Sequence, residues 1–596
     1  MLYRSTSEMF LDRVQQSADN EAYRYKKDGH WISVTWADFG RQTRNIALSL
    51  LDLGLGKGDA VAIIANTRHE WETADKAINL FGGITVGIYQ TLPANQIEYI
   101  VQHSEAKAIF IEDAEQYTKI QEIAGACPEL KTLILIDPEG VEAGDWLLYA
   151  DLAADNQNKE LEYGRVLDKL TTSIMAGDTS TYIYTSGTTG PPKGAIITHA
   201  NFLAEADLLI DAVGINDDDV TISWLPFSHV FQRATTAAGT FGGAPTAFAE
   251  SIDKLLSNIS EVRPTIFYSV PRVYEKAYAK IIEQAENGGA LKKKIFYWSM
   301  NVGRQVSQLR EKKQPIPGGL NLKYGIAKKL VFNKIKNVFG GRVRFIASSG
   351  APIAKEILEF FHAADLLPLE AYGATEITAA VSLNLKDAYR FGTVGKAAKN
   401  TDIKIAPDGE ILIRGGTVFA GYFKDPERTK EVLSEDGWYA TGDIGKIDDD
   451  GFLTITDRKR DIIVTSGGKN VAPQNIENMI KQSPYISQAM IHGDKRNYLT
   501  CLITLDQETM TSWAQKQRLT VDDWVAFCAL PEVVALIDGE IGKVNQSLAR
   551  FETIKKFRIV PDDFTVEAGD LTPTLKVKRR VVSEKYKNLL DAMYQE

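Results

Sequence analysis

The strongest constraint on the fold is an alternation of short apolar runs with longer amphipathic segments. Residues 59–66 read DAVAIIAN, a continuous apolar run typical of a strand buried on both faces. Residues 69–83, HEWETADKAINLFGG, have helical spacing and end on glycines, and residues 107–113, KAIFIED, return to a strand pattern. A strand, a helix and a second strand in this order predict an α/β fold with parallel sheets covered by helices.

The same unit recurs along the chain before the pattern changes. Further strand patterns occur at residues 132–137, 180–185, 265–271 and 342–350. After about residue 405, short runs separated by Asp-Gly turns indicate antiparallel pairs. We therefore predict a large N-terminal domain of helix-covered sheets, residues 1–459, and a small α+β domain, residues 460–596.

Length, charge and cysteine content narrow the class of protein. A chain of 596 residues exceeds one typical core, and 68 Lys and Arg against 78 Asp and Glu, a net charge of -10, argue against a general nucleic-acid binder. The three cysteines match no metal-ligand spacing, which favours buried free thiols in a reducing compartment. The N-terminus lacks a signal-peptide pattern, and no run reaches the ~20 apolar residues of a membrane span. These features predict a cytoplasmic protein, with peripheral membrane contact left open.

Residues 184–199, YTSGTTGPPKGAIITH, form a loop rich in glycine and hydroxyl groups that ends in Lys193. Glycines permit close backbone approach, hydroxyls donate hydrogen bonds and the lysine adds positive charge, a combination that suits phosphate. A Walker loop would lead into a helix, whereas strand patterns flank this loop on both sides. An alternative is a glycine-rich hairpin with no ligand.

This loop resembles the phosphate-binding signature of the adenylate-forming (AMP-binding) superfamily, which includes acyl-CoA synthetases, luciferases and peptide-synthetase adenylation domains. Five further segments resemble the superfamily's motifs in the same order: SSGAPI (348–353), AYGATEIT (371–378), YATGD (439–443), DRKRDIIVTSGGKNVAP (457–473) and LTPTLKVKRR (571–580). Six ordered motifs cover nearly the whole chain. The sequence is therefore identified as a member of this superfamily, with ATP, Mg²⁺ and coenzyme A as implied cofactors or co-substrates.

The resemblance implies roles for individual residues. Glu376 matches the magnesium-binding glutamate, Thr375 a phosphate-contacting hydroxyl and Tyr372 the aromatic side chain that packs on adenine, although a tyrosine there also suits an ordinary core. Asp443 matches the ribose-binding aspartate, and Arg458 a second ribose or phosphate contact. The other positions matched to nucleotide-binding motifs are Thr185, Ser186, Gly187, Thr188, Thr189, Gly190, Lys193, Gly350, Ala351, Pro352, Gly373 and Ala374, with Thr188 also expected to act in catalysis.

Lys576 is implied to be the catalytic lysine of the small domain. Its ammonium would bridge the substrate carboxylate and the α-phosphate, although KVKRR also suits a solvated basic run. The superfamily rotates its small domain to admit a thiol, about a hinge that falls on Arg460 here, where aspartate or lysine is more common. The small domain is therefore expected to be mobile, and Gly467 and Gly468 would then face the pantetheine arm or simply form a turn.

WLPFSHVFQR (224–233) and YSVPRVYEK (268–276) resemble the long-chain fatty acyl-CoA synthetase branch. His229 matches a histidine beside the acyl site, where it would position the carboxylate or line the channel, although a satisfied structural histidine is the alternative. A tryptophan gate of some long-chain enzymes aligns near Arg233, so an aromatic gate is not expected. The sequence leaves chain length open.

Residues 291–345 are basic, whereas the chain as a whole is acidic. This local excess of positive charge suggests contact with an anionic membrane, although a solvated helical face or a site for an acidic carrier protein fits equally. The segment has Glu311 as its single acidic residue and interleaves Phe296, Tyr297, Trp298, Phe332 and Phe339. Its basic residues include Lys292, Lys293, Lys294, Arg304, Arg310, Lys312, Lys313, Lys328, Lys329, Lys334 and Lys336.

The favoured function is a long-chain fatty acid–CoA ligase. One alternative is a ligase that loads acyl carrier protein, and another is a catalytically silent nucleotide- or lipid-binding protein of the same fold. A homodimer is compatible with the sequence.

Overall fold

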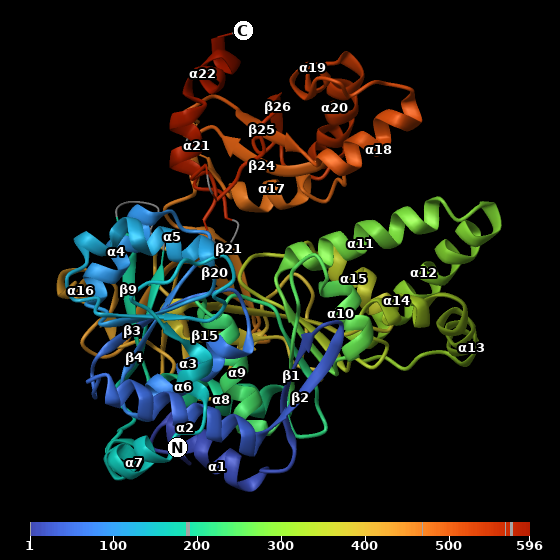
Figure 1. Ribbon diagram of the computed structural model, residues 1–596. Coiled ribbons are helices and arrows are strands. Elements are labelled where there is room, and N and C mark those ends of the chain that lie inside the picture. Colours follow the sequence, from blue (N-terminus) through green and yellow to red (C-terminus); the bar gives the residue numbers. More distant parts are fainter. Residues whose placement is uncertain (1, 186–190, 468, 567, 573–575, 596) are drawn as a thin grey trace.

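The computed structural model describes residues 2–185, 191–467, 469–566, 568–572 and 576–595. The chain forms a large body and a smaller C-terminal body that lies against it (Figure 1). Both contain helices and strands, so the predicted α/β class with a large and a small domain is confirmed. Among the described residues, no helix combines the length and hydropathy needed to cross a membrane. Cys127, Cys501 and Cys528 are buried and free, as predicted.

An eight-stranded sheet forms the first half of the large body. Across the sheet its strands are β19 (Gly421–Tyr422), β9 (Lys193–Thr198), β8 (Thr179–Thr185), β4 (Ile84–Ile88), β3 (Ala60–Ile64), β5 (Ala108–Ile111), β6 (Thr132–Leu135) and β7 (Leu147–Leu148). The pairs from β8 to β7 are parallel, whereas β9 is antiparallel to β8 and to β19. The predicted strand–helix–strand unit is therefore present.

Helices cover both faces of this sheet. Alternate residues of β3 enter different cores: Val61 and Ile63 join one cluster, whereas Ala62 and Ile64 join another. This alternation explains the continuous apolar run, because a strand covered on both faces buries every side chain. The helices that contribute to these two cores include α2 (Trp36–Asp52), α3 (His69–Leu80), α6 (Tyr149–Ala153) and α7 (Gln157–Thr172) on one face, and α4 (Ala94–Ser104) and α5 (Ala114–Ile123) on the other.

A five-stranded sheet forms the second half, with α8 (His199–Val213) and α9 (Val230–Gly242) packed between the two sheets. Its strands are β12 (Ile266–Ser269), β13 (Phe345–Ser348), β14 (Pro368–Ala374), β15 (Ala379–Leu383) and β16 (Lys396–Ala397). The pairs β12–β13 and β13–β14 are parallel, and the last two pairs are antiparallel. Helix α8 begins directly after β9 because Thr198 and Asn201 form a capping box.

Two smaller sheets complete the large body. The first contains β10 (Thr221–Ser223), β11 (Thr246–Phe248), β1 (Glu21–Lys27) and β2 (His30–Thr35), and the second contains β17 (Thr401–Ile405), β18 (Glu410–Gly415), β20 (Tyr439–Ile447) and β21 (Leu453–Arg458). The second sheet is antiparallel throughout, as its Asp-Gly turns predict. The remaining helices nearby are α1 (Thr6–Gln16), α10 (Leu255–Val262) and α16 (Pro426–Val432).

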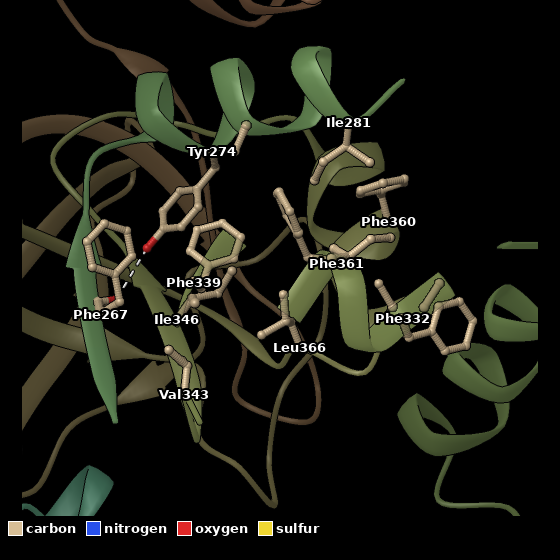
Figure 2. Close-up of a cluster of buried hydrophobic side chains, with 14 of the residues drawn as sticks. Phe267, Tyr274, Ile281, Phe332, Phe339, Val343, Ile346, Phe360, Phe361 and Leu366 are labelled. Carbon is tan, nitrogen blue, oxygen red and sulfur yellow. Dashed lines mark hydrogen bonds between the residues drawn. The ribbon is translucent and has the colours of Figure 1, made fainter. Parts of the chain in front are cut away.

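A helical lobe projects from one side of the large body (Figure 1). It contains α11 (Pro271–Glu286), α12 (Ala290–Glu311), α13 (Gly318–Ala327), a π-helical segment (Lys328–Phe332), α14 (Asn333–Val338) and α15 (Lys355–Ala363). Figure 2 shows the core beneath it, in which Tyr274 and Phe339 pack on Phe267 of β12 and also on Phe361. The next residue, Tyr268, belongs to a different cluster because side chains alternate along a strand.

The small body starts after β21. It contains β22 (Ile463–Val464), β23 (Asn470–Val471), α17 (Pro473–Ile480), β24 (Ile486–His492), β25 (Leu499–Leu505), α18 (Gln507–Gln517), α19 (Trp524–Cys528), α20 (Pro531–Asn545), β26 (Ile554–Ile559), α21 (Arg579–Lys585) and α22 (Lys587–Gln595). Two apolar clusters hold it together, and all their described buried members follow residue 462. The amide of Asn475 donates to the Thr456 carbonyl at 3.0 Å and joins the two bodies.

Candidate active site

The glycine-rich loop joins β8 to β9, as its flanking strand patterns predict. The two strands are antiparallel, and Thr185 lies opposite Lys193 in their register. A hairpin places the end of β8 beside Lys193 without a helix, so the structure differs from a Walker loop as the sequence predicts. The central predicted positions of the loop, Ser186, Gly187, Thr188, Thr189 and Gly190, lie outside the described residues.

Glu376 lies in a short 3₁₀ turn, η3 (Thr375–Ile377), that follows β14. Its Oε1 atom accepts a hydrogen bond of 2.8 Å from the Tyr422 hydroxyl, and the Lys193 ammonium lies 4.8 Å from the centroid of the Tyr422 ring. Burial, followed by the nearby Arg428 side chain, lowers the pKa of Lys193. Tyr422 therefore links the predicted phosphate-binding lysine to the predicted metal-binding carboxylate.

The donor chemistry at Glu376 fits a magnesium ion. A carboxylate has about four acceptor positions, so the bond from Tyr422 leaves capacity for a hard cation that prefers oxygen ligands. The adjacent Thr375 is a buried residue that carries a further oxygen. Both belong to the segment that leads from β14 to β15.

The backbone around Glu376 leaves no room for a side chain at Gly373. A Cβ atom there would lie 1.2 Å from the Ala379 carbonyl oxygen, because β14 and β15 approach closely. Thr378 and Ala379 have φ angles of 50° and 89°, an uncommon conformation for residues other than glycine. The glycine of the YGATE motif is thus required by close packing, and the strained turn fixes the direction of Glu376.

Tyr422, which no sequence motif identified, positions the Glu376 carboxylate through its hydrogen bond. This role gives a first testable prediction. We expect Tyr422→Phe to raise by about 10-fold the magnesium concentration needed for half-maximal pyrophosphate release, because a hydrogen bond to a charged group contributes about 1.5–3 kcal/mol. The matched control is Tyr297→Phe, which removes a Tyr–Glu hydrogen bond to Glu286 on the exposed lobe. Equal magnesium dependence in the two variants would contradict the assigned role.

Three predicted nucleotide contacts, from three different strands, meet at one place. The Tyr372 hydroxyl on β14 donates to Asp443 Oδ2 at 2.5 Å, and Arg458 Nε lies 3.4 Å from Asp443 Oδ1. Asp443 and Arg458 are also paired residues of β20 and β21. Burial, with the neighbouring Asp443, raises the pKa of Tyr372, so its hydroxyl stays protonated and donates. Tyr372 is buried in a core cluster and also holds the carboxylate in place.

Gly350, Ala351 and Pro352 follow β13, the strand that pairs with β14. Gly350 has a φ angle of 85°, a conformation that favours glycine. The preceding residue, Ser349, donates its backbone N–H to the Ser269 carbonyl at 3.2 Å, which fixes the turn beside β12.

Lys576 of the small body is brought to the large body's site. Its loop is closed by two hydrogen bonds, from Thr572 N–H to the Lys576 carbonyl and from Lys576 N–H to Thr572 Oγ1, at 2.8 and 3.1 Å. Burial, then Arg458, lowers the pKa of Lys576 to about 8, while the charges of Asp443 and Glu376 oppose that shift. The ammonium is thus close enough to Asp443, the predicted ribose contact, and to Glu376, the predicted magnesium ligand, for their charges to act on it.

His229 caps the start of α9. Its Nδ1 atom accepts the backbone N–H of Phe231 at 3.1 Å, which places the ring proton of a neutral imidazole on Nε2. Burial, followed by the positive charge of Lys576, lowers the pKa of His229 to about 4. The ring is therefore neutral at pH 7 and offers one N–H donor near Lys576.

Arg233 lies one helical turn after His229 and is buried. It forms an ion pair with Asp75 of α3 and donates to the Thr181 hydroxyl of β8. Arg233 therefore joins α9 to α3 and to β8 of the eight-stranded sheet.

Of the other predicted residues of the small body, Arg460 lies close enough to the site for its positive charge to help lower the pKa of both Lys193 and Lys576. Arg460 follows β21, and Gly467 lies in an exposed turn between β22 and β23, where the Ser466 N–H donates to the Arg496 carbonyl. Gly468 lies outside the described residues.

Comparison with known proteins assigns the family. The profile of the AMP-binding enzyme family matches residues 10–423, and that of the AMP-binding enzyme C-terminal domain matches residues 460–596. The chain therefore belongs to the AMP-binding enzyme family.

Similar proteins span nearly the whole chain. A long-chain-fatty-acid–CoA ligase of Mycobacterium bovis is 37% identical over 591 residues, covering 98% of this chain and 96% of that ligase. Fatty acyl-CoA synthetase A of Dictyostelium discoideum is 33% identical and covers 98% of this chain and 88% of its own length.

Solved structures share the fold at lower identity. An anthranilate CoA ligase in complex with anthranoyl-AMP has a TM-score of 0.71 at 18% identity, with 98% of each chain covered. The adenylation domain of a carboxylate reductase from Mycobacterium chelonae has a TM-score of 0.75 at 22% identity, covering 100% of this chain and 92% of that domain.

Proposed function

We propose that this protein is an ATP-dependent long-chain fatty acid–CoA ligase. The observation that carries the proposal is the group of contacts among Tyr372, Asp443 and Arg458 in the large body. The charge of Lys576, from the small body, interacts with Asp443, Glu376 and His229 beside it. Full-length similarity to ligases of long-chain fatty acids supports the substrate class. In the first step the acid and ATP give acyl-adenylate and pyrophosphate, and in the second coenzyme A displaces AMP to give the thioester.

The first step requires two anions to approach. A carboxylate oxygen attacks the α-phosphorus of ATP, and two like unit charges at ~4 Å repel by about 4 kcal/mol at an effective dielectric of ~20. The Lys576 ammonium offsets this repulsion from the side of the small body, and the His229 Nε2–H orients the attacking carboxylate. Asp443 holds the ribose hydroxyls, and Tyr372 keeps Asp443 in position. Magnesium, held through Glu376, would neutralise charge on the phosphates.

The second step needs access for the thiol. We propose that the small domain, residues 460–596, turns about Arg460 relative to residues 1–459, withdraws Lys576 and brings Gly467 and Gly468 toward the pantetheine arm. Support comes from the separate apolar cores of the small body and from the family profile that begins at residue 460. The thiol sulfur then attacks the adenylate carbonyl, and AMP leaves.

The deciding experiment measures pyrophosphate release with ATP, magnesium and a series of fatty acids from short to long. It is run with coenzyme A, with acyl carrier protein and without a thiol. Turnover with coenzyme A that peaks at long chains supports the proposal. Turnover only with the carrier protein would assign the carrier-loading reaction instead, and the absence of turnover with every acid would favour a silent binding protein.

We further propose that the helical lobe contacts an anionic lipid surface. Leu322, Ile326 and Leu330 recur every four residues and are exposed, and Leu322 has 70% of its surface accessible. Exposed lysines accompany them at positions 323, 329 and 334. Apolar side chains flanked by cations fit the interface of an anionic bilayer.

The structure also corrects the sequence-based description of this segment. Phe296, Phe332 and Phe339 are buried core residues, so only Tyr297 and Trp298 of the five aromatic residues are exposed. Some cations are neutralised by acidic partners outside the segment. Arg310, Lys328 and Lys336 surround Asp365 at 3.2, 2.8 and 3.1 Å, and Lys293 pairs with Glu286.

A second prediction tests this surface by vesicle sedimentation. We expect the double variant Leu322→Asp/Ile326→Asp to bind anionic vesicles at least 10-fold more weakly than wild type, because it removes apolar contacts and adds like charge. The matched control is Leu161→Asp on α7, where the leucine is 84% exposed but lies outside the lobe. Equal, weak binding of wild type to anionic and neutral vesicles would remove the proposal.

A further inference from the structure

A cavity lies among α8, α9 and the five-stranded sheet, and most of its lining is apolar. It reaches Ser349 and Ala347 at one side, next to the turn that contains Gly350, and extends along α9 past Phe231 and Ala234. Its volume of about 40 Å³ has room for a few water molecules, so side chains must shift before a long chain enters. Its position beside the turn that contains Gly350, a predicted nucleotide-binding residue, makes this space the candidate acyl cavity, an assignment that rests on the proposed function.

Five residues with polar side-chain groups interrupt the apolar lining: Glu205, Thr235, Tyr268, Ser349 and Asn384. Two of them have a buried oxygen atom without a hydrogen-bond partner among the described residues. Glu205 on α8 has no exposed surface, and its Oε1 atom accepts the Ala380 N–H at 2.9 Å. Its Oε2 atom has no hydrogen-bond partner among the described residues, and neither has the hydroxyl of Tyr268 on β12, which is 8% exposed. Both residues line the same cavity.

The protonation state of Glu205 defines what it can bind. Burial raises the pKa of this carboxyl well above its usual range, so the group is neutral at pH 7. Because Oε1 already accepts a backbone amide, the proton is best placed on Oε2, which becomes a donor. Tyr268 also stays protonated, since burial raises the pKa of its hydroxyl. The cavity wall therefore contains two O–H groups without an acceptor. Both are covered in this structure, where the surface that faces the cavity is apolar, so the side-chain shift that admits a chain must also bring them into contact with it.

A plain hydrocarbon chain would leave both O–H groups unpaired, and an unpaired buried donor is unfavourable. An oxygen atom carried on the chain would accept from them. We propose that Glu205 and Tyr268 form a polar subsite within the acyl cavity that selects long-chain fatty acids bearing a hydroxyl group along the chain. A site built to bond a hydroxyl discriminates strongly against the analogue that lacks it, whereas a purely apolar pocket does not.

The alternative occupant is ordered water. Water molecules could satisfy Glu205 Oε2 and the Tyr268 hydroxyl, and the cavity is large enough to hold them. In that case an acyl hydroxyl would gain nothing over water, and activity would not depend on where the hydroxyl lies along the chain. The two occupants therefore differ in a measurable positional profile.

The experiment measures kcat/KM for pyrophosphate release with octadecanoic acid and with monohydroxylated octadecanoic acids whose hydroxyl moves along the chain. Thermal shift with the same acids gives an independent binding readout. For wild type we expect a maximum at one hydroxyl position, at least about 10-fold above the plain acid. Glu205→Gln, which keeps a donor, should retain the maximum. Glu205→Met and Tyr268→Phe should lower it toward the value of the plain acid.

A matched control removes another buried carboxyl outside the cavity, through Glu72→Met on α3, and should leave the shape of the profile unchanged. If Glu205→Met fails to fold, Tyr268→Phe still tests the subsite with a smaller change. A flat profile in wild type, with the plain acid active, would overturn this inference alone. Lack of turnover and binding with every acid would overturn the proposed function as well.

Discussion

Replacing Lys576 by alanine is expected to lower acyl-adenylate formation by about 10²–10³-fold, the usual effect of losing one electrostatic contact to a transition state. Thioester formation from supplied acyl-adenylate should stay near the wild-type rate, because that step breaks no bond at phosphorus. Adenylation is measured by pyrophosphate release without thiol, and transfer by acyl-CoA formation from the synthetic adenylate. The two half-reactions are thereby separated in one protein.

The matched control is Lys587→Ala, an exposed lysine at the start of α22 in the same small body. It should leave both half-reactions unchanged. An equal loss of adenylation and transfer in Lys576→Ala would contradict the assigned role and would indicate a general structural defect.

The same lysine gives adenylation a pH dependence whose sign follows from its charge. The pKa of Lys576 is lowered to about 8, chiefly by burial, so the ammonium is charged below that pH and neutral above it. We expect kcat/KM for adenylation to fall as pH rises through about 8, since this ratio reports the free enzyme. In kcat, which reports the enzyme with its substrates bound, the fall should occur at higher pH, because negatively charged phosphates favour the charged ammonium. In Lys576→Arg the fall should be absent, because a guanidinium stays charged. His229, with its pKa near 4, adds no change around neutrality.

Replacing Arg233 by methionine is expected to destabilise the large body by about 3–5 kcal/mol, because the change leaves the Asp75 carboxylate buried without its cation. The melting temperature should fall by several degrees, as measured by differential scanning fluorimetry. The double variant Arg233→Met/Asp75→Asn should recover part of that loss, since the uncompensated charge is then gone.

The control is Arg44→Met, which breaks ion pairs with Glu160 and Asp168 on the surface. Solvent-exposed pairs contribute about 0–1 kcal/mol, so its melting temperature should change little. Similar shifts for Arg44→Met and Arg233→Met would contradict a stabilising role for the buried pair. The Arg233 side chain also joins α9, which carries His229 at its start, to α3 and β8.

Local patterns predicted much of the fold. Apolar runs predicted β3, β8 and β9, and helical spacing predicted α3, because the pattern of buried side chains in one element is visible in its own consecutive residues. The hairpin at the glycine-rich loop and the antiparallel pairs after residue 405 were also predicted correctly. These features depend on contacts between residues close in the chain.

The rest depends on contacts that no local pattern encodes. Tyr422 reaches Glu376 across 46 positions, and Glu205 accepts the amide of Ala380 across 175. The aromatic residues of the lobe show the same limit, since Phe332 and Tyr297 lie in similarly basic surroundings but only the first is buried. Motif resemblance identified Asp443 and Tyr372 as candidates, whereas the hydrogen bond between them is visible only in the structure.

The separate apolar cores of the small body have an evolutionary consequence. Their described buried residues all follow residue 462, so Lys576, the proposed catalytic lysine, is carried by a part that does not share its interior with the proposed acyl cavity. Substitutions that reshape the cavity can accumulate without disturbing the packing that supports the lysine. A gene with this layout can diversify in substrate choice while its chemistry stays constant. Recombination near the junction between the two bodies would exchange a complete body rather than part of an apolar core.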